Sequence, residues 1–323
     1  MSTVLINSEQ VAILLSTYNG EKYLAKQIES ILNQDYDNFV LYIRDDNSKD
    51  GTRVIINDFV RKYDNVFFLN PNDYVNLGVT KSFFYLLKQV NANYYMFSDQ
   101  DDVWMRDKVS KTLKKMKESE ILTKPSLVHT NLYLVDNELD IIGDKIWGDN
   151  VSTEFKQLIF TNNVAGCTSM INNVMKNFII ADEDKYDEMF MHDWWIALIA
   201  SGFGVNAFVK DETMFYRQHA DNVVGGVDGV VSRLKRISKI GTEIKRSNKI
   251  LRQAAAFFDA HSDDLNPSDK KYLSEYANIW HDGSAYKNLL TIIKFPNKKS
   301  TLSGKIMLSF FLVILPKKLR SNG

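Results

Sequence analysis

Short apolar runs alternate with segments of helical periodicity over the first 100 residues, and this alternation limits the folds open to the chain. Four runs are read as strands, 11–17 (VAILLST), 39–46 (FVLYIRDD), 66–70 (VFFLN) and 94–98 (YYMFS), and the unbroken first run is typical of a strand buried on both faces. Three intervening segments carry an apolar stripe at helical spacing: 24–32, 52–63 and 79–90. Strands that alternate with helices predict an α/β fold with a mostly parallel sheet flanked by helices, in which ligands bind at the carboxyl ends of the strands.

Polar side chains follow three of these strands. They are Ser16, Thr17 and Tyr18 after the first strand, Asp45 and Asp46 at the end of the second, and Asp99, Asp101 and Asp102 after the fourth. Carboxylates this close repel one another and raise one another's pKa, so the last group costs stability unless solvent or a cation offsets it. Hard oxygen ligands at a strand end are what Mg²⁺ or Mn²⁺ prefers, and such an ion can bridge a diphosphate. A solvated acidic loop, or an N-cap for a helix over 106–122, explains the cluster equally well.

Composition and motifs exclude several classes of function. Net charge is zero, from 40 basic and 40 acidic residues, so nothing global points to nucleic acid. The chain has no GxxxxGKS/T loop and no GxGxxG after its first strand, which removes the main support for P-loop and nicotinamide-dependent proteins. A single cysteine, Cys167, excludes an intrachain disulfide and a cysteine-built zinc site. Because the N-terminus also lacks the pattern of a signal peptide, we expect a cytoplasmic protein.

The pattern changes twice further along the chain. From about residue 126 it mixes strands and helices, and after Gly226 it becomes helical and basic. We therefore expect one domain over 1–226 and a helical, basic C-terminal extension over 227–323.

An apolar segment, 306–316 (IMLSFFLVILP), lies near the C-terminus and is about half as long as the roughly 20 residues that span a bilayer. Basic residues surround it, and no acidic residue occurs from 298 to 323. Basic flanks around an apolar segment predict adsorption to an anionic membrane surface. A solvated helix face and a buried terminal helix are alternatives that the sequence leaves open.

Five motifs, taken together, resemble those of the family 2 glycosyltransferases, nucleotide-sugar enzymes of the GT-A fold. The motifs are STYNG (16–20), DDNSKDGT (45–52), DQDD (99–102), HDWW (192–195) and YRQHADN (216–222). The resemblance covers about residues 10–225, and the forms SDQDDVW, HDWW and RQHADN are most similar to the rhamnosyltransferase-like branch of bacterial polysaccharide assembly. It implies a GT-A (Rossmann-like) domain with a nucleotide-binding half over about 10–125 and an acceptor half over about 126–226.

Position by position, the resemblance implies a nucleotide pocket. Its residues are Ser16, Thr17, Tyr18, Asp46, Lys81 and Asp101. Asp46 is expected to accept from the N3–H of a pyrimidine, since an ionised carboxylate is only an acceptor; a cap or an Asx-turn is its alternative role. Tyr18 is expected to stack on the base and Lys81 to lie near the diphosphate. A core aromatic and an ordinary solvated lysine are the alternatives for these two residues.

The resemblance also implies a metal site and a catalytic base. Asp102 and Asp101 are expected to bind Mn²⁺ or Mg²⁺, with His219 as a further ligand or as a structural histidine. Asp193 matches the general base that deprotonates the acceptor hydroxyl, although an aspartate at a helix start is usually a cap. His192 stands where many members have glutamate, which leaves its role open.

Two further residues match the acceptor side of the family's site, Gly166 and Trp194. A small residue such as Gly166 permits close approach of a substrate. Trp194 and Trp195 can stack on a sugar or fill the core, and we expect Trp195 to lie in the core. Cys167 has no identifiable catalytic partner and is expected to be a small buried residue.

The implied function is inverting, metal-dependent transfer of a sugar from a nucleotide diphosphate to a hydroxyl of a growing bacterial surface or capsular glycan. L-Rhamnose from dTDP-rhamnose is the first choice of donor, and a UDP-hexose is the alternative. If the acceptor is lipid-linked, we expect the enzyme at the inner face of the cell membrane, held peripherally by its C-terminal region. A non-catalytic partner that binds nucleotide or glycan is a competing hypothesis from another class.

Overall fold

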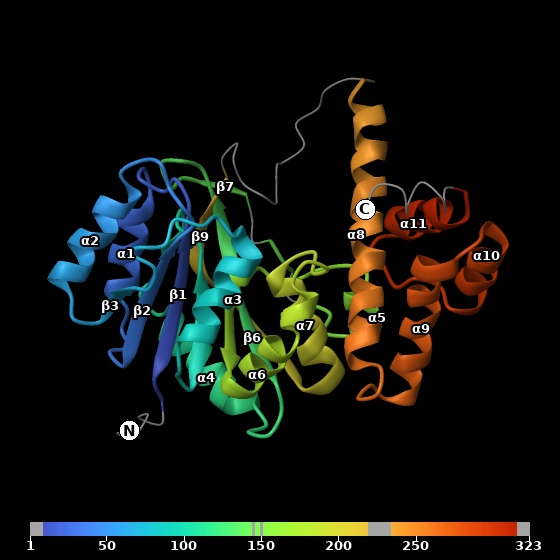
Figure 1. Ribbon diagram of the computed structural model, residues 1–323, viewed down its shortest axis with the longest axis horizontal. Helices are drawn as coiled ribbons and strands as arrows, with labels where there is room; N and C mark the ends of the chain where they lie inside the picture. The colour runs from blue at the N-terminus through green and yellow to red at the C-terminus, as the bar shows by residue number, and fades with distance from the viewer. Residues whose placement is uncertain (1–8, 144–145, 149–150, 219–233, 315–323) are drawn as a thin grey trace. The chain divides into compact units, whose positions relative to one another are not determined.

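The computed structural model describes residues 9–143, 146–148, 151–218 and 234–314, and Figure 1 traces its elements. The chain forms two compact units. The first comprises Met1–Val151, Val164–Ala181 and Gly204–Gly226, and the second comprises Ser152–Asn163, Asp182–Phe203 and Val227–Gly323. The second unit therefore includes segments well before residue 226. The predicted domain boundary at 226 lies outside the described residues and stays a prediction.

Four parallel strands form one half of the sheet in the first unit. They are β1 (Val11–Thr17), β2 (Phe39–Asp45), β3 (Val66–Phe68) and β4 (Tyr94–Ser98). Their order is β3-β2-β1-β4, and each neighbouring pair is parallel. The connecting helices are α1 (Leu24–Leu32), α2 (Thr52–Lys62) and α3 (Val79–Gln89). The alternation of strands and helices predicted from the apolar runs is confirmed.

Strand β1 lies between β2 and β4 and has no exposed face. Val11 and Ile13 join a core cluster with Leu24 and Ile28 of α1, and Leu14, whose side chain alternates to the other face, is also fully buried. A strand that is covered on both faces needs apolar residues at successive positions, which explains the unbroken run VAILL. The end of β1, where its polar residues begin, is therefore held between β2 and β4.

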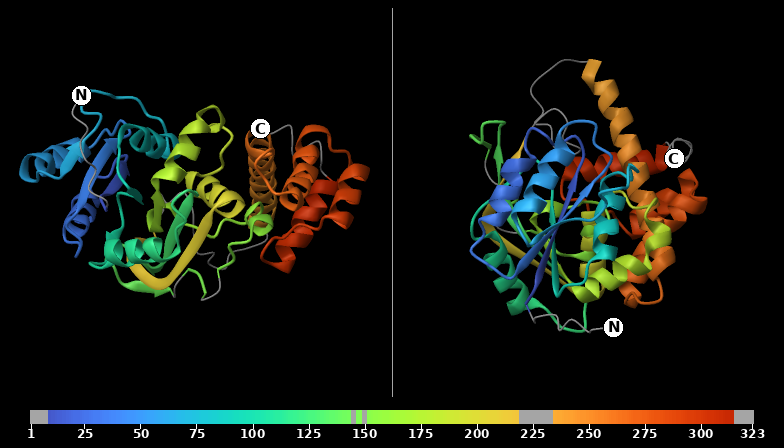
Figure 2. Two further views of the ribbon diagram at one scale, coloured as in Figure 1. Left: turned by 90° about the horizontal axis from the view of Figure 1, so that it is seen from below. Right: turned by 60° about the vertical axis from the view of Figure 1, so that its left-hand side comes forward.

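The sheet continues through antiparallel strands. β8 (Ser169–Asn172) pairs with β4, and β6 (Ser126–Val135) pairs with β8, whereas β9 (Val205–Arg217) runs parallel to β6. Two short strands complete it, β5 (Val103–Trp104) against β9 and β7 (Ile141–Gly143) against β6. Register shifts between β6 and β9 accompany the curl of β9 that Figure 2 shows. Because β4 and β5 both belong to the sheet, the acidic loop 99–102 is anchored at its two ends.

Helices make up most of the second unit. They are α5 (Phe155–Leu158), α7 (His192–Phe203), α8 (Leu234–His261), α9 (Pro267–Asp282), α10 (Ala285–Lys294) and α11 (Leu302–Ile314). Trp195 and Phe203 pack on Phe257, and the buried Asp182 accepts a hydrogen bond from Trp195 Nε1 at 2.8 Å. The core position expected for Trp195 and the helical C-terminal extension are as predicted. Among the described helices, none is both long and apolar enough to cross a membrane.

One buried histidine gives the first unit a dependence on pH. His129 of β6 is 0% exposed, its ring packs against Trp147 and Phe208, and neither ring nitrogen has a hydrogen-bond partner among the described residues. Burial lowers its pKa from 6.5 to about 3. The folded chain thus keeps the ring neutral, whereas the unfolded chain takes up a proton below pH 6.5. Stability is therefore lost as the pH falls from 6.5 towards 3, by about 2 kcal/mol at pH 5.

Substituting His129→Phe should remove this part of the acid sensitivity, because phenylalanine has no proton to gain. We expect urea unfolding at neutral pH and at pH 5 to show a smaller loss for the variant than for the wild type, by about 2 kcal/mol. His281→Gln is a matched control, since the His281 side chain is 48% exposed. Equal acid sensitivity in the wild type and in His129→Phe would contradict this prediction.

Candidate active site

The end of β1 is clamped to the acidic loop by one amide side chain. Gln100 Oε1 accepts from Thr17 Oγ1 at 2.5 Å and from Tyr18 N at 2.7 Å, and Gln100 Nε2 donates to Tyr18 O at 3.0 Å. A Cβ on Gly20 would lie 2.5 Å from Gln100 Oε1, so glycine is required at this position for the clamp to form. We did not single out Gln100 from the sequence; the only signal was an amide placed among three carboxylates.

Tyr18 lies immediately after β1 with 48% of its surface exposed. Asn19 follows with a positive φ of 49°, which asparagine tolerates better than most residues. Thr17, the other residue that bonds to Gln100, is buried at the end of β1, and Ser16 before it is half-buried. Tyr18 therefore offers an exposed ring at the carboxyl end of the central strand, while its stacking on a base stays a prediction.

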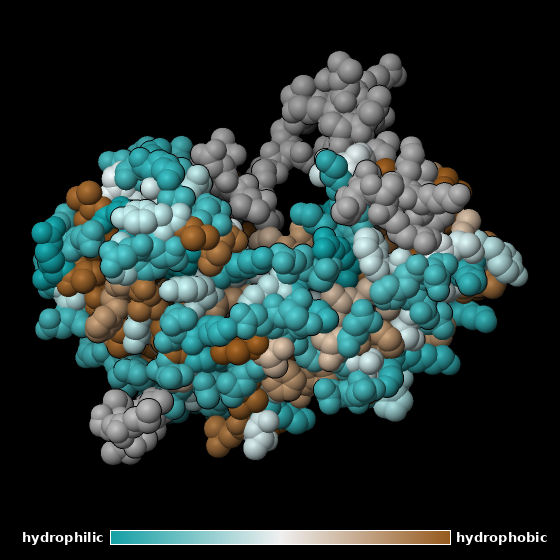
Figure 3. Space-filling model, in the orientation of Figure 1, coloured by the Kyte–Doolittle hydropathy of each residue, from teal (hydrophilic) through white to brown (hydrophobic). Residues whose placement is uncertain are grey.

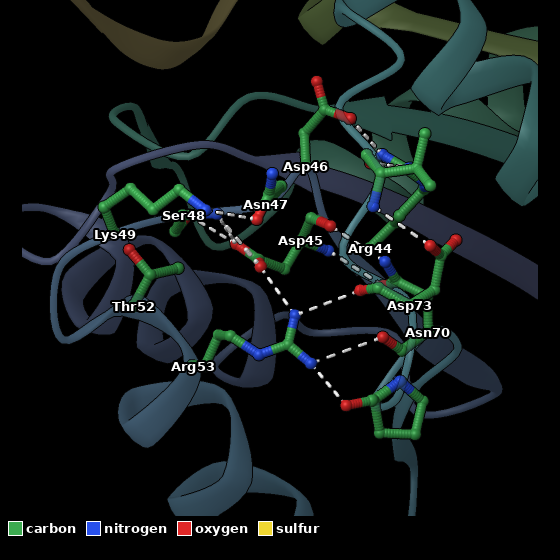
Figure 4. Close-up of polar contacts among 12 residues, drawn as sticks. Arg44, Asp45, Asp46, Asn47, Ser48, Lys49, Thr52, Arg53, Asn70 and Asp73 are labelled. Atoms are coloured by element: carbon green, nitrogen blue, oxygen red, sulfur yellow. Dashed lines mark hydrogen bonds and ion pairs between the residues drawn. The ribbon is translucent and has the colours of Figure 1, made fainter.

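The loop after β2 pairs its first carboxylate with an arginine, as Figure 4 shows. Asp45 accepts from Arg53 Nη1 at 2.8 Å and from Ser48 N at 3.2 Å. Arg53 also donates to the Pro71 carbonyl, and Asn70 bonds to the Asp45 backbone in both directions. The local side-chain bond to the loop backbone is thus made by Asp45, to the N–H three residues on, and Asp45 also ties the loop to α2 and to the segment after β3.

The second carboxylate of this loop, Asp46, is 4% exposed and has three donors. Its oxygens accept from Arg44 Nη1 at 2.5 Å, Leu77 N at 2.6 Å and Gly78 N at 2.8 Å. Gly78 has a φ of 75°, a conformation that glycine adopts without strain, and it directly precedes α3. Arg44 is fully buried and also donates to Ser82 Oγ and the Val75 carbonyl. In this structure Asp46 fixes the start of α3, and its three donors leave the carboxylate able to accept one more hydrogen bond, as from a pyrimidine N3–H.

The acidic cluster behaves differently because its innermost member has no such donor. Asp102 is 1% exposed, and neither of its carboxylate oxygens has a nitrogen or oxygen partner among the described residues. Burial, followed by the charges of Asp101 and Asp99, raises the pKa of Asp102 well above its usual value. Ligand atoms of Asp99, Asp102 and Cys167 all lie within 4.8 Å of one another. A buried carboxylate that has a thiol neighbour but no nitrogen or oxygen donor among the described residues, beside a second carboxylate, is an arrangement that a cation stabilises.

The donor set fits a hard divalent cation. Asp102 and Asp99 supply carboxylate oxygens, the ligands that Mn²⁺ and Mg²⁺ prefer. Burial and the Asp102 charge raise the pKa of the Cys167 thiol, which keeps it protonated and a poor ligand for such an ion. We expected Asp101 beside Asp102; within the described residues the ligand atoms that come together are those of Asp99 and Asp102, with Asp101 in the same loop and half-buried.

A buried lysine lies behind this cluster. Lys108 is 0% exposed, and its Nζ lies 3.4 Å from Thr213 Oγ1 and 4.8 Å from the centre of the Trp104 ring. Burial lowers the pKa of Lys108 to about 8, although the neighbouring acidic groups oppose this shift. Lys108 occupies a buried position of α4 (Lys108–Ser119), one turn before Thr112. A lysine at a buried position of a helix was the signal in the sequence that could have identified Lys108, and we did not use it.

Asp193 and the residues beside it belong to the second unit. Asp193 lies in the first turn of α7, is 6% exposed, and accepts from Asn162 Nδ2 at 3.0 Å through Oδ1. A carboxylate in the first turn is favoured by the helix dipole. Burial lowers the pKa of His192 to about 3, so this ring is neutral. Trp194 is 2% exposed and donates to the Leu158 carbonyl, so its burial does not favour the acceptor-side role that we expected.

Three other predicted site residues have simpler positions. Lys81 lies in the first turn of α3 and is half-buried. Gly166 is buried in a short 3₁₀ helix, Gly166–Thr168, directly before β8 and beside Cys167. His219 lies outside the described residues.

Comparison with known sequences places these elements in a family. Residues 12–181 match the profile described as glycosyl transferase family 2. The dTDP-rhamnosyl transferase RfbG of Shigella flexneri is 28% identical over 236 residues, which cover 70% of this chain and 78% of that protein. The UDP-Glc:alpha-D-GlcNAc-diphosphoundecaprenol beta-1,3-glucosyltransferase WfaP of Escherichia coli is 26% identical, covering 67% of this chain and 80% of that protein.

Two solved structures resemble the fold. Staphylococcus aureus TarS aligns with 97% of this chain and 53% of its own, so this chain spans about half its length, with a TM-score of 0.55 at 14% identity. The mannosyltransferase PcManGT of Pyrobaculum calidifontis, solved with GDP-Man and Mn²⁺, aligns with 96% of this chain and 83% of its own, with a TM-score of 0.53 at 12% identity. These similarities confirm the predicted GT-A fold.

Replacing Asp102 with asparagine should stabilise the protein when metal is absent. Asp102→Asn removes a buried carboxylate that has no nitrogen or oxygen donor among the described residues, together with its repulsion by Asp99 and Asp101. We expect its melting temperature in EDTA to exceed that of the wild type by a few degrees, for a gain on the order of 1 kcal/mol. Adding Mn²⁺ with dTDP should raise the melting temperature of the wild type and leave that of the variant unchanged.

Asp211→Asn is the control for this experiment, because Asp211 is a 60% exposed partner of Lys111 outside the acidic loop. It should melt like the wild type and keep the response to Mn²⁺. An Asp102→Asn variant that melts below the wild type in EDTA would mean that the cluster is stabilised by the protein itself.

Proposed function

Because the chain belongs to glycosyl transferase family 2, we propose that it transfers L-rhamnose from dTDP-rhamnose to a hydroxyl of a growing bacterial surface glycan. The observation that carries this proposal is the buried Asp102 carboxylate, which has no nitrogen or oxygen donor among the described residues and lies beside Asp99 at the end of β4. The choice of donor is supported by the similarity to the Shigella flexneri dTDP-rhamnosyl transferase over 78% of its length. Inversion at the anomeric carbon is typical of the family.

The nucleotide would bind at the carboxyl ends of β1, β2 and β4. The exposed Tyr18 ring is suited to stacking on the thymine, and Ser16 and Thr17 lie in the strand that precedes it. Asp46 would accept from the N3–H of the base in addition to its three present donors, and Lys81 would lie near the diphosphate from the first turn of α3.

Asp102, with Asp99 or Asp101, would hold Mn²⁺ or Mg²⁺ beside the diphosphate. When bound there, the ion supplies positive charge to the leaving group, which carries more negative charge as its bond to the sugar breaks. Gln100 positions the loop between these carboxylates by its three hydrogen bonds to the end of β1. His219 is proposed as a further ligand and lies outside the described residues.

Asp193 is the proposed general base. Its carboxylate takes the proton of the acceptor hydroxyl, the hydroxyl oxygen forms a bond to the anomeric carbon, and the bond from that carbon to the diphosphate breaks on the opposite face. The nucleotide diphosphate leaves with the electron pair of the broken bond. Asn162 Nδ2, which donates to Asp193 at 3.0 Å, orients the carboxylate for this step.

The acceptor is proposed to be a lipid-linked glycan. The Escherichia coli relative is named for transfer to an acceptor carried on diphosphoundecaprenol, a lipid carrier. We therefore propose a cytoplasmic enzyme that works at the inner face of the cell membrane, on capsular or cell-wall polysaccharide.

A UDP-hexose is the second candidate donor. The Escherichia coli relative that is named for UDP-Glc is 26% identical over 80% of its length, close to the value for the dTDP-rhamnosyl transferase. Asp46 does not discriminate between a UDP-sugar and a dTDP-sugar, because uracil and thymine carry the same N3–H group. A direct comparison of dTDP-rhamnose and UDP-glucose as donors, with lipid-linked glycan acceptors, decides between the two.

Asp193→Asn should abolish transfer while it preserves nucleotide binding. Loss of a general base typically lowers kcat by about 10²–10⁴-fold, and asparagine keeps the size and the hydrogen bond to Asn162. Transfer is measured as release of dTDP or UDP in the presence of acceptor, and nucleotide affinity by calorimetry. Asp184→Asn, a change at an exposed carboxylate of the same unit, should leave both unchanged. Full activity of Asp193→Asn would contradict the assignment of the base.

A further inference from the structure

Helix α10 turns its apolar face to the solvent. Tyr286 and Ile293 are 71% and 67% exposed, and Leu289 and Leu290 are 43% and 37% exposed. These four positions follow the spacing i, i+3, i+4, i+7 and therefore lie on one face of the helix. A surface helix of a globular protein ordinarily buries such a face.

The polar residues of the same helix point inward and hold it in this orientation. Asn288 is 1% exposed and donates from Nδ2 to the Leu312 carbonyl of α11 at 2.6 Å. Thr291 is 9% exposed and donates from Oγ1 to Glu275 Oε2 of α9 at 3.2 Å. Rotating α10 to bury its apolar face would break both hydrogen bonds, so the exposure is built into the packing of the unit.

Helix α11 adds a second apolar face. Four residues at a spacing of four are exposed by 53% to 74%: Leu302, Ile306, Phe310 and Ile314. The opposite side of the helix buries Leu308 and Leu312 in the protein. In the view of Figure 3, a few hydrophobic side chains are visible at the edge of the region over α10 and α11, among hydrophilic ones. Exposed apolar surface on two adjacent helices is typical of a binding surface rather than of a solvated one.

The chain segment that carries both helices has charges of one sign. Every charged residue from 283 to 323 is basic, whereas the whole chain has 40 basic and 40 acidic residues. Those within the described residues are Lys287, Lys294, Lys298, Lys299 and Lys305. Apolar side chains on a segment whose charged residues are all basic are complementary to a surface that is apolar below and negatively charged at its edge.

We propose that the outward faces of α10 and α11 form a membrane-docking surface that binds an anionic lipid bilayer. The apolar side chains enter the boundary between headgroups and acyl chains, and the lysines contact lipid phosphates. Tyr286 suits this boundary because its ring is apolar and its hydroxyl is polar. Both helices lie in the plane of the membrane and neither spans it, in agreement with their lengths of 10 and 13 residues. The inference concerns the second unit and does not depend on the identity of the sugar.

The test is flotation of the full-length protein with vesicles of phosphatidylcholine alone and of phosphatidylcholine with phosphatidylglycerol. We expect the wild type to float with the anionic vesicles and to remain in the dense fraction with the neutral ones. The double variant Ile293→Ser with Phe310→Ser should lose flotation, because both side chains lie on the docking surface. Lys287→Gln and Lys294→Gln should each weaken binding to anionic vesicles by about fivefold.

Val54→Ser with Leu122→Ser is the matched control, since these residues are 64% and 78% exposed on the first unit. It should float like the wild type, and all variants should keep the wild-type melting temperature, which excludes unfolding as the cause of any loss. Failure of the wild type to float, or flotation of the Ile293→Ser, Phe310→Ser variant at the wild-type level, would overturn the proposal. A dimer that Ile293→Ser with Phe310→Ser dissociates, seen by sedimentation without lipid binding, would also overturn it and assign the faces to contact between copies of the chain.

Discussion

A buried carboxylate with no nitrogen or oxygen donor among the described residues is the constraint on which the rest of the candidate site depends. Asp102 is almost inaccessible to solvent, has acidic neighbours in Asp99 and Asp101, and has no ion pair among the described residues. The loop that carries it remains in place because the sheet holds both ends and because Gln100 bonds to the end of β1. The buried Lys108 offsets part of the charge without pairing with it. Folding thus buries the Asp102 carboxylate at a cost in stability, and a divalent cation would offset that cost.

The loop after β2 also has buried carboxylates, but there each carboxylate is paired with an arginine. Asp45 and Asp46 are buried like Asp102, yet Arg53 pairs with Asp45 and the fully buried Arg44 pairs with Asp46. Burial of a carboxylate therefore does not by itself indicate a ligand site in this chain. Asp45 and Asp46 stabilise the loop and the start of α3, whereas Asp102 has no comparable nitrogen donor within the described part of the chain.

The sequence predicted the half of the fold that local patterns encode. Runs such as VAILL are long enough to reveal strands buried on both faces, and the alternation with helices implied the parallel sheet. The pairing of β5 with β9 and the crossing of the chain between two units depend on contacts distant in sequence, which periodicity does not carry. Side-chain partners were equally hidden: only folding brings Gln100 to the end of β1, and Lys108 and Cys167 to Asp102. The apolar residues of α10 were visible as a stripe, but only the inward hydrogen bonds of Asn288 and Thr291 show that this stripe faces outward.

The central claim is that a nucleotide diphosphate and a divalent cation share the site at Asp102. Calorimetric titration of dTDP, UDP and GDP into the wild type and into Asp102→Ala, each with Mn²⁺ and with EDTA, tests it most directly. The account predicts that dTDP or UDP binds with Mn²⁺, that EDTA removes the binding, and that Asp102→Ala weakens it. Binding that is indifferent to both EDTA and the substitution would contradict the shared site, and the acidic cluster would then need a different explanation.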